Sequence, residues 1–199
     1  MPKTLMKLKI FVVYHRDIHN DLYDKDSISS IVFIGVGKDI EKRHYRRKKY
    51  NIIYEKDLPI YGASLQEKGY NETSAIYHIY ANKVYHGLSY IGFTQYDVFI
   101  RNDVIKKIVQ TIANDSSKCY IFYMTKCPML FKPDKIPYEF VINSYNNYFK
   151  TNFTTTELIN NPYTCNNLIM KSTFVIPVKL FEKMMPWISK LMDELDSWV

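Results

Sequence analysis

The chain has 199 residues, 47% hydrophobic and 24% charged, which predicts a single globular domain, residues 1–199, that folds without a disulfide or a structural metal. Its three cysteines have no CxxC spacing, and no apolar run approaches the roughly 18 residues of a membrane span. These features argue against a zinc site, a disulfide framework and an integral membrane protein, so we expect a cytoplasmic location.

Two short apolar runs open the chain. Residues Lys7–Tyr14 (KLKIFVVY) and Ser30–Val36 (SIVFIGV) are rich in β-branched and aromatic side chains, which predicts two buried strands. The polar stretch between them, residues 18–29, is interpreted as a loop. Residues 50–69 contain proline and glycine at intervals and predict mostly irregular structure.

A helix and a central strand follow. Asn71 can cap a helix from Glu72 to about His86, because apolar residues recur there at helical spacing and Gly87 ends the pattern. The apolar run that starts at Tyr90 predicts a buried strand. Only a short connection separates the helix from this strand, as a parallel crossover requires.

The C-terminal half continues the alternation of helices and strands, which favours an α/β sandwich with a largely parallel sheet. A last helix is expected to start near Pro177, and Pro186 should kink or split it. The other predicted elements of this half are helices over residues 103–114 and 138–149, a strand over Cys119–Met124 (CYIFYM), and two strand pieces over residues 168–170 and 173–176.

The net charge of +7 is concentrated in one segment. Residues 38–49 hold seven Lys or Arg against Asp39 and Glu41, a local net charge of +5. Such a patch favours a polyanionic neighbour, so a basic nucleic-acid-binding module is one hypothesis for this protein. A solvated surface segment explains the same charge equally well.

The central strand ends in a polar tip, Gln95 and Asp97, separated by one aromatic residue. In an open α/β sheet, ligands bind beyond the carboxyl ends of the strands, so both residues are candidates for binding or catalysis. The alternative is structural: Asp97 would cap the following turn, and Gln95 would be a hydrogen-bonded polar group. The sequence contains no nucleophile elbow, P-loop, zinc-protease motif or dinucleotide fingerprint.

Four ordered segments resemble the landmarks of a known family: FVVYH (Phe11–His15), NETSAIYH (Asn71–His78), YIGFTQYD (Tyr90–Asp97) and NNLIMK (Asn166–Lys171). The family is glycosyltransferase-like, and its members occur in bacterial capsule and lipopolysaccharide loci and in large DNA viruses. The resemblance implies a GT-A-like fold, a three-layer α/β sandwich with a mixed, largely parallel central sheet. It also implies transfer of a sugar from a nucleotide-diphospho-sugar, a UDP-sugar being favoured, to a glycan, lipid or protein acceptor.

The resemblance further implies roles for particular residues. Tyr14 and His15 would lie beside the base or ribose of the donor. Gln95 and Asp97 would stand where GT-A enzymes commonly keep an Asp-x-Asp pair, with both residues serving catalysis and Asp97 binding Mg²⁺ or Mn²⁺ against the diphosphate. Because Gln95 offers only an amide oxygen, one carboxylate remains where two are usual, and metal dependence stays open.

Two more residues match positions of the family. Glu72 would face the donor sugar or simply stabilise its helix through the helix dipole. Asn166 would bind sugar hydroxyls or simply favour a turn. The basic residues of segment 38–49 offer another way to neutralise the diphosphate.

The departure at Gln95 keeps a third hypothesis open, a catalytically idle relative of the transferase fold that serves as a scaffold. The chain also ends earlier than the resemblance leads us to expect, so part of an acceptor site would be missing or would be supplied by a partner.

Overall fold

The computed structural model describes residues 7–16, 18, 22–37, 40, 51–70, 72–125, 138–160 and 167–196. The chain groups into two compact units. The first comprises Met1–Ile121 and Lys171–Glu182, and the second comprises Phe122–Met170 and Lys183–Val199. Each unit is described by itself below, and the single-domain organisation of residues 1–199 stays a prediction.

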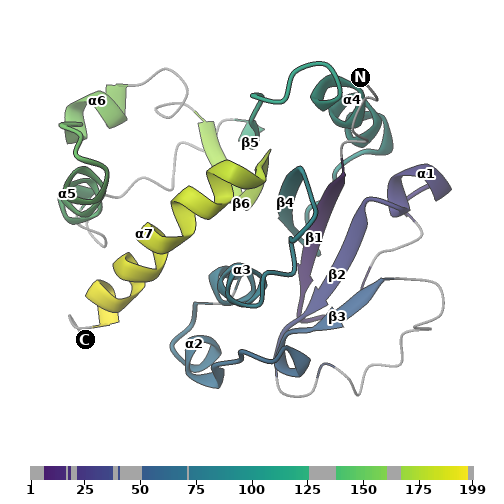
Figure 1. Ribbon diagram of the computed structural model, residues 1–199, viewed down its shortest axis with the longest axis horizontal. Helices are drawn as coiled ribbons and strands as arrows, with labels where there is room; N and C mark the ends of the chain where they lie inside the picture. Colours follow the sequence, from purple (N-terminus) through teal and green to yellow (C-terminus); the bar gives the residue numbers. More distant parts are fainter. Residues whose placement is uncertain are drawn as a thin grey trace. The chain divides into compact units, whose positions relative to one another are not determined.

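A six-stranded sheet organises the fold (Figure 1), with the strand order β3-β2-β1-β4-β6-β5. Strand β1 pairs in parallel with β2 and with β4, and β2 pairs in parallel with β3, whereas β4 and β6 are antiparallel. The mixed, largely parallel sheet predicted from the sequence is therefore confirmed. The strands are β1 (Leu8–Tyr14), β2 (Ile31–Gly35), β3 (Ile52–Tyr54), β4 (Tyr90–Gln95), β5 (Tyr120–Thr125) and β6 (Asn167–Pro177).

The parallel register aligns the carboxyl ends of four strands. Tyr14 lies opposite Gly35, which in turn lies opposite Tyr54. On the other side of β1, Val13 lies opposite Gln95. The loops that follow β1, β2, β3 and β4 therefore all leave from the same edge of the sheet.

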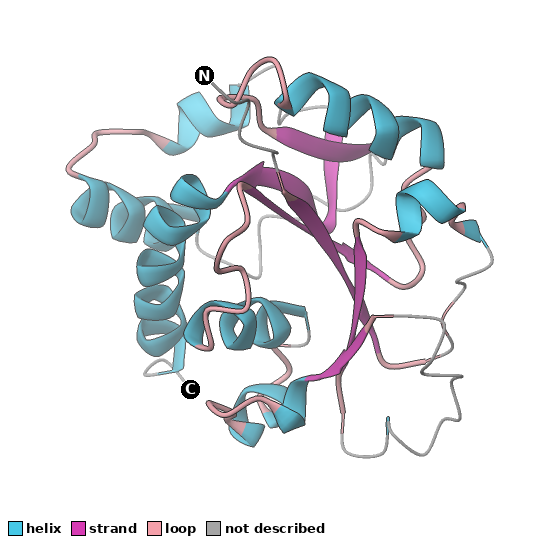
Figure 2. Ribbon diagram, turned by 45° about the vertical axis from the view of Figure 1, so that its right-hand side comes forward, coloured by secondary structure: helices cyan, strands magenta, loops and turns pink. Residues whose placement is uncertain are grey.

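Helices cover both sides of the strands in the first unit, and Figure 2 shows helical segments on either side of the twisted sheet. The helical elements of this unit are α1 (Lys25–Ile28), the 3₁₀ helix η4 (Glu55–Asp57), α2 (Ala63–Glu67), α3 (Glu72–Ala81), α4 (Asn102–Ile112) and the first residues of α7 (Val178–Asp196).

Alternating side chains give the sheet two different faces. On one face, the rings of Phe11 and Phe93 stack with their centroids 5.5 Å apart, and Phe93 contacts Phe181 of α7 at 5.7 Å. On the other face, Phe33 lies opposite Val12 and its ring meets Tyr23 edge-on at 6.3 Å. Both faces therefore carry packed aromatic rings.

Two segments expected to lack regular structure contain short elements instead. The predicted loop 18–29 holds α1, because Asp24 caps it by accepting a hydrogen bond of 2.7 Å from the backbone N–H of Ser27. The predicted irregular segment 50–69 holds β3, η4 and α2. Strand β3 has only three residues and takes its pairing from β2, so its own sequence carries a weak strand signal.

Three predicted boundaries are also corrected. Helix α3 ends at Ala81, before the predicted end at His86, because the chain turns there and Lys83 adopts a positive φ of 51°. The two predicted strand pieces near residues 168–176 form one continuous strand, β6. Helix α7 continues through Pro186 as one helix, so of the two predicted outcomes, a kink or a split, the split does not occur.

The second unit contains α5 (Tyr138–Phe149), α6 (Thr155–Asn160) and most of α7. The predicted helix over residues 138–149 is confirmed. The ring of Tyr145 packs against Phe149 at 4.6 Å and edge-on against Trp187 at 5.2 Å, and Ser144 donates a hydrogen bond of 2.8 Å to Glu194. An aromatic cluster therefore holds α5 to α7. Within the part of the chain that the structure describes, no helix has the length and apolar character to span a bilayer.

Candidate ligand-binding site

A polar cavity of about 380 Å³ opens at the carboxyl edge of the sheet. Its volume falls within the range of roughly 300–1,000 Å³ that is usual for small-molecule sites. The described residues that line it come from the ends of β1, β2 and β4 and from α2 and α3: Val13, His15, Val36, Gly37, Gln66, Glu72 and Tyr96.

The parallel topology explains why the cavity lies here. His15, Gly37 and Tyr96 each follow within two residues of a strand end, and aligned parallel strands place such residues along one edge. Gly37 has a φ of 101°, which an L side chain rarely adopts, so the chain leaves β2 through a turn that favours glycine. The strand ends thus form one wall of the cavity and the two helices supply the other.

An aromatic pair lies at the strand side of the cavity. The rings of His15 and Tyr96 meet edge-on, with centroids 4.9 Å apart and planes inclined by 79°. His15 is exposed and Tyr96 is half-buried, so both rings remain accessible to a ligand. Flat π-systems at a wet site are suited to stacking against a nucleobase or packing against a sugar ring.

Glu72 supplies the carboxylate of the helical wall. It is half-buried and begins α3, where the partial positive charge of the helix N-terminus stabilises an anion. Among the described residues that line the cavity, it is the one that bears a carboxyl group. A carboxylate in this position accepts hydrogen bonds from ligand hydroxyls.

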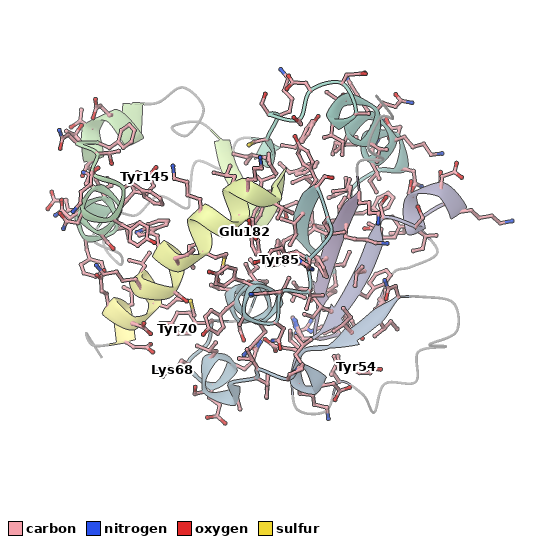
Figure 3. All side chains as sticks on the ribbon, in the orientation of Figure 1. Tyr54, Lys68, Tyr70, Tyr85, Tyr145 and Glu182 are labelled. Carbon is pink, nitrogen blue, oxygen red and sulfur yellow. The ribbon has the colours of Figure 1, made fainter. Side chains whose placement is uncertain are left out.

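A buried network supports the helical wall from behind. Glu55, the first residue of η4, accepts hydrogen bonds from Ser74 Oγ at 2.6 Å and from Gln66 Nε2 at 3.0 Å. His78 Nδ1 lies 2.7 Å from Glu55 Oε1, and the two side chains are only 0% and 1% exposed. Two labels in Figure 3 mark where this network lies: Tyr54 directly precedes Glu55, and Lys68 directly follows α2, the helix that supplies Gln66.

The hydrogen bonds fix the tautomer of His78. Its Nε2 accepts a hydrogen bond of 2.9 Å from the backbone N–H of Gly62, so Nε2 carries no proton. The proton is therefore on Nδ1, which donates to Glu55. The ring of Tyr61 covers His78 at 5.1 Å, and burial, reinforced by the nearby charges of Glu55 and Glu67, raises the pKa of Tyr61.

The structure places five of the six residues predicted from the sequence. His15 and Glu72 line the cavity. Gln95 is buried at the end of β4 and lies opposite Val13, a residue of the lining, while Asp97 is exposed in the following turn. Tyr14 is fully buried on the face opposite to Val13, and its hydroxyl packs so closely on Gly35 that a Cβ there would come within 2.9 Å.

Asn166 lies outside the described residues, as does the basic segment 38–49 apart from Ile40. Of the predicted residues that can be placed, Tyr14, Gln95 and Asp97 do not contribute to the lining of the cavity. The roles assigned to all six predicted residues stay predictions.

Sequence reasoning missed Gln66, Tyr96, Glu55 and His78. Gln66 lies in a short helix inside a segment interpreted as irregular, and Tyr96 was treated as a spacer between two polar residues. Glu55 and His78 are 23 positions apart, and the pairing of β3 with the sheet brings them together. One signal was available: Ser74 and His78 recur at i and i+4 on the buried side of α3, where apolar residues were expected.

The donor set for a metal ion is sparse. Across the described ranges, no group of three or more His, Cys, Asp or Glu side chains is positioned to hold a metal ion. Mg²⁺ binds proteins through as few as one or two carboxylates when substrate phosphates and water complete its shell. Asp97 offers one such carboxylate. Without phosphate and water ligands it does not form a metal site.

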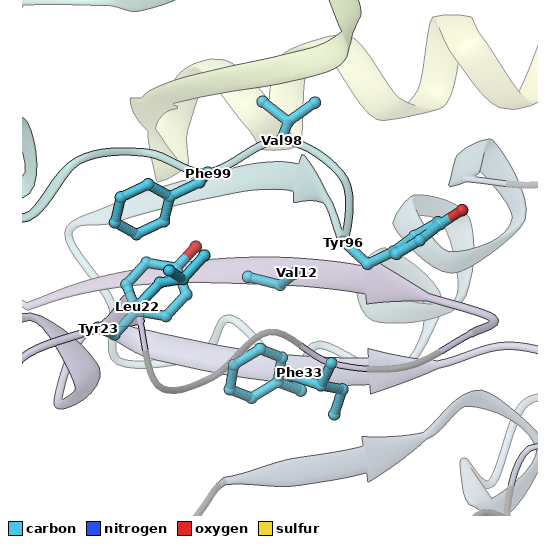
Figure 4. Close-up of a pocket in the computed structure, with 8 residues that line it drawn as sticks. Val12, Leu22, Tyr23, Phe33, Tyr96, Val98 and Phe99 are labelled. Carbon is cyan, nitrogen blue, oxygen red and sulfur yellow. The ribbon is translucent and has the colours of Figure 1, made fainter.

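A second hollow on the other face of the sheet is nearly filled (Figure 4). Its volume is about 10 Å³, no more than the space of a single water molecule. Phe33, Tyr23 and Phe99 crowd around it, whereas the ring of Tyr96 points away from them. This crevice is a packing feature and not a ligand site.

No protein-family model matches the sequence, and no curated protein matches it. Among solved structures, the chain is similar to the apo structure of WbbM, a bifunctional glycosyltransferase, with a TM-score of 0.61 and 12% sequence identity. The match covers 97% of this chain and 38% of WbbM, so the chain spans well under half the length of that protein. At this identity the likeness establishes a fold, and that fold is the GT-A-like glycosyltransferase fold expected from the sequence.

Proposed function

We propose that this protein is a glycosyltransferase that binds a nucleotide-diphospho-sugar in the cavity at the carboxyl edge of its sheet. One observation carries the proposal: the polar cavity lies at the ends of β1, β2 and β4, the edge where open α/β sheets bind ligands. The fold likeness to WbbM supports the same reading.

The chemistry of the cavity wall suits such a donor. The rings of His15 and Tyr96 would stack on the base or pack against the ribose, and Glu72 would accept hydrogen bonds from hydroxyls of the sugar. A UDP-sugar is the first donor to test. The acceptor would be a glycan, a lipid or a protein.

The remaining predicted residues take supporting roles in this proposal. Gln95 and Tyr14, both buried, would hold the ends of β4 and β1 in place beneath the donor. Asp97 would contribute one carboxylate oxygen to Mg²⁺ or Mn²⁺, whose other ligands would come from the diphosphate and water. Such a cation would neutralise charge on the departing nucleoside diphosphate. Asn166 would bind sugar hydroxyls.

Donor binding can be measured directly. Titration calorimetry with UDP-, GDP- and CMP-sugars, with and without Mn²⁺, should reveal at least one donor that binds the wild-type chain. Tyr96→Ala should weaken that binding by about 5- to 150-fold, since base–aromatic stacking contributes about 1–3 kcal/mol. Tyr148→Ala, which removes an exposed tyrosine of the second unit, is the matched control and should bind as wild type.

Absence of binding by every donor would contradict the proposal. A donor that binds Tyr96→Ala as tightly as wild type would place the site elsewhere. Binding without turnover on any acceptor would favour the catalytically idle scaffold. Asp97→Ala tests the metal role separately: if Asp97 binds the metal, the effect of Mn²⁺ on donor affinity should be lost in this variant, and if Asp97 only caps the turn, the effect should remain.

The nucleic-acid hypothesis remains a separate prediction. It depends on segment 38–49, which apart from Ile40 lies outside the described residues. Salt-sensitive binding of single-stranded oligonucleotides, lost when the arginines of this segment are replaced, would support it.

A further inference from the structure

The turn that follows β4 carries Tyr96, which lines the cavity. Backbone hydrogen bonds hold this turn: the N–H of Tyr96 donates to the carbonyl oxygen of Val13 at 2.9 Å, and the N–H of Val98 donates to that of Gln95 at 3.0 Å. The second of these bonds closes the turn. A side chain adds a further bond, because Thr94 Oγ1 donates to the carbonyl oxygen of Val98 at 3.2 Å.

A second threonine lies beside Thr94. The Oγ1 atom of Thr173, on β6, is 3.4 Å from Oγ1 of Thr94, and the two side chains are only 0% and 1% exposed. Thr94 lies opposite Val12, which borders the apolar crevice, whereas the next residue of β1, Val13, borders the cavity. Because side chains alternate along a strand, the threonine pair lies on the packed face of the sheet.

The direction of both bonds follows from the number of protons. A hydroxyl group has one proton to donate, and a carbonyl oxygen can only accept. Because Thr94 donates its proton to Val98, it can only accept from Thr173. The chain of hydrogen bonds therefore starts at Thr173 and ends at the turn. Neither threonine is titratable, so this direction does not change with pH.

We propose that Thr94 is a positioning residue that holds the turn with Tyr96 at the cavity. The turn also carries Asp97, so the same bond acts on the residue proposed to bind the metal. Thr173 permits this role because it donates to Thr94 and leaves the Thr94 proton for Val98. The bonds of the turn do not depend on a ligand, and only the effect on a nucleotide-sugar rests on the proposed function.

Thr94→Val tests the turn without any ligand. Valine keeps the β-branched shape and loses the hydroxyl, so the bond to Val98 disappears. Hydrogen exchange of the Val98 amide, followed by proton–nitrogen NMR, should become about two- to tenfold faster, as expected for one lost hydrogen bond. Thr94→Ser keeps the hydroxyl and is the matched control, with exchange close to that of wild type. Unchanged exchange in Thr94→Val would overturn the proposal.

Thr173→Val tests the direction of the chain. Thr94 keeps its proton and its acceptor in this variant, so exchange of the Val98 amide should stay within about twofold of wild type. If Thr173→Val loosened the turn as much as Thr94→Val does, the assigned direction would be wrong.

The double variant Thr94→Val/Thr173→Val separates positioning from stability. Thr94→Val leaves the buried hydroxyl of Thr173 without an acceptor and should lower Tm by at least about 2 °C. The double variant removes that hydroxyl, so it should recover part of the Tm while exchange at Val98 stays fast. Recovery of slow exchange would show that Thr94 acts only through stability. No recovery of Tm would show that Thr173 does not donate to Thr94.

Binding of UDP and of UDP-glucose then measures the consequence for the ligand. Thr94→Val should weaken binding about two- to tenfold, a smaller loss than that of Tyr96→Ala, because the ring is displaced and not removed. Thr94→Ser should restore binding to within about twofold of wild type, whereas the double variant should bind no better than Thr94→Val. Wild-type affinity in Thr94→Val would overturn the positioning role.

If neither probe binds the wild-type chain, the proposed donor fails, while exchange at Val98 still decides whether Thr94 holds the turn.

Discussion

The two faces of the sheet differ sharply at the same edge. Val12 and Val13 are neighbours in β1, yet Val12 borders an apolar crevice of about 10 Å³ and Val13 borders a polar cavity of about 380 Å³. Tyr96 contributes to both. Alternation of side chains along one strand thus separates a packed face from an open one.

At this edge of the sheet, aromatic packing fills the space on one face, whereas a cavity remains on the other face. On the packed face, Tyr23 and Phe99 meet edge-on at 5.1 Å, and burial raises the pKa of Tyr23 to about 12 despite a hydrogen bond with the backbone of Ile100. On the open face, short helices carry polar side chains to the edge and a buried carboxylate holds them. We therefore expect truncation of side chains on the first face to alter mainly stability, and truncation of cavity-lining side chains on the second to alter mainly binding.

The largest effect should come from Phe33→Ala on the packed face. Phe33 is only 1% exposed, and its removal leaves a cavity among aromatic neighbours, which should lower the free energy of unfolding by about 3–5 kcal/mol. Urea unfolding followed by tryptophan fluorescence measures this loss. A cost below about 1 kcal/mol would mean that the crevice can collapse and is not tightly packed.

Gly92→Ala should have the next largest effect. A Cβ there would come within 2.7 Å of Val175 and 2.9 Å of the backbone oxygen of Phe174, and the backbone cannot easily move in a paired strand. We expect a loss of about 1–3 kcal/mol from overpacking, measured by the same unfolding experiment. Wild-type stability would show that β4 and β6 are not this closely paired.

Gly37→Ala tests the open face through a different cause. A Cβ at Gly37 meets no atom within 4 Å, so any loss of stability should come only from the φ of 101°. We expect the free energy of unfolding, measured by urea unfolding, to fall by roughly 1–2 kcal/mol. Gly62→Ala is the control, since Gly62 has a φ of −122° and a Cβ there would have its nearest contact at 3.9 Å. A larger loss at Gly62 than at Gly37 would contradict this assignment.

The smallest effect concerns the pH dependence of Asp24, at the rim of the packed face. The Lys106 ammonium and the Ser27 N–H hold the pKa of this carboxyl at about 2, below its ordinary 3.8. The stability it contributes is fully present above about pH 3.8 and is lost as the pH falls toward 2. Asp24→Asn should therefore flatten the acid limb of a Tm-against-pH curve slightly, and identical curves would contradict the role.

The contrast between the faces also explains how far the sequence could predict the site. His15 and Glu72, which line the cavity, each mark the edge of an apolar pattern in the sequence, at the end of a strand or the start of a helix. Gln95 is predicted as a site residue on the same ground; it is buried and is not among the described residues that line the cavity. Position along a strand is visible in the sequence, whereas the depth of a side chain below the surface is not.

The sequence by itself determined the alternation of elements and hence the α/β class, because apolar periodicity is a local property of the chain. Apolar periodicity did not predict β3, which has three residues, or α2, which has five, since elements this short are stabilised by their neighbours.

Only the tertiary structure joined Glu55 to His78 and brought Gln66 to the cavity. Burying a carboxylate is favourable only when donors surround it, and those donors come from segments that meet in space alone.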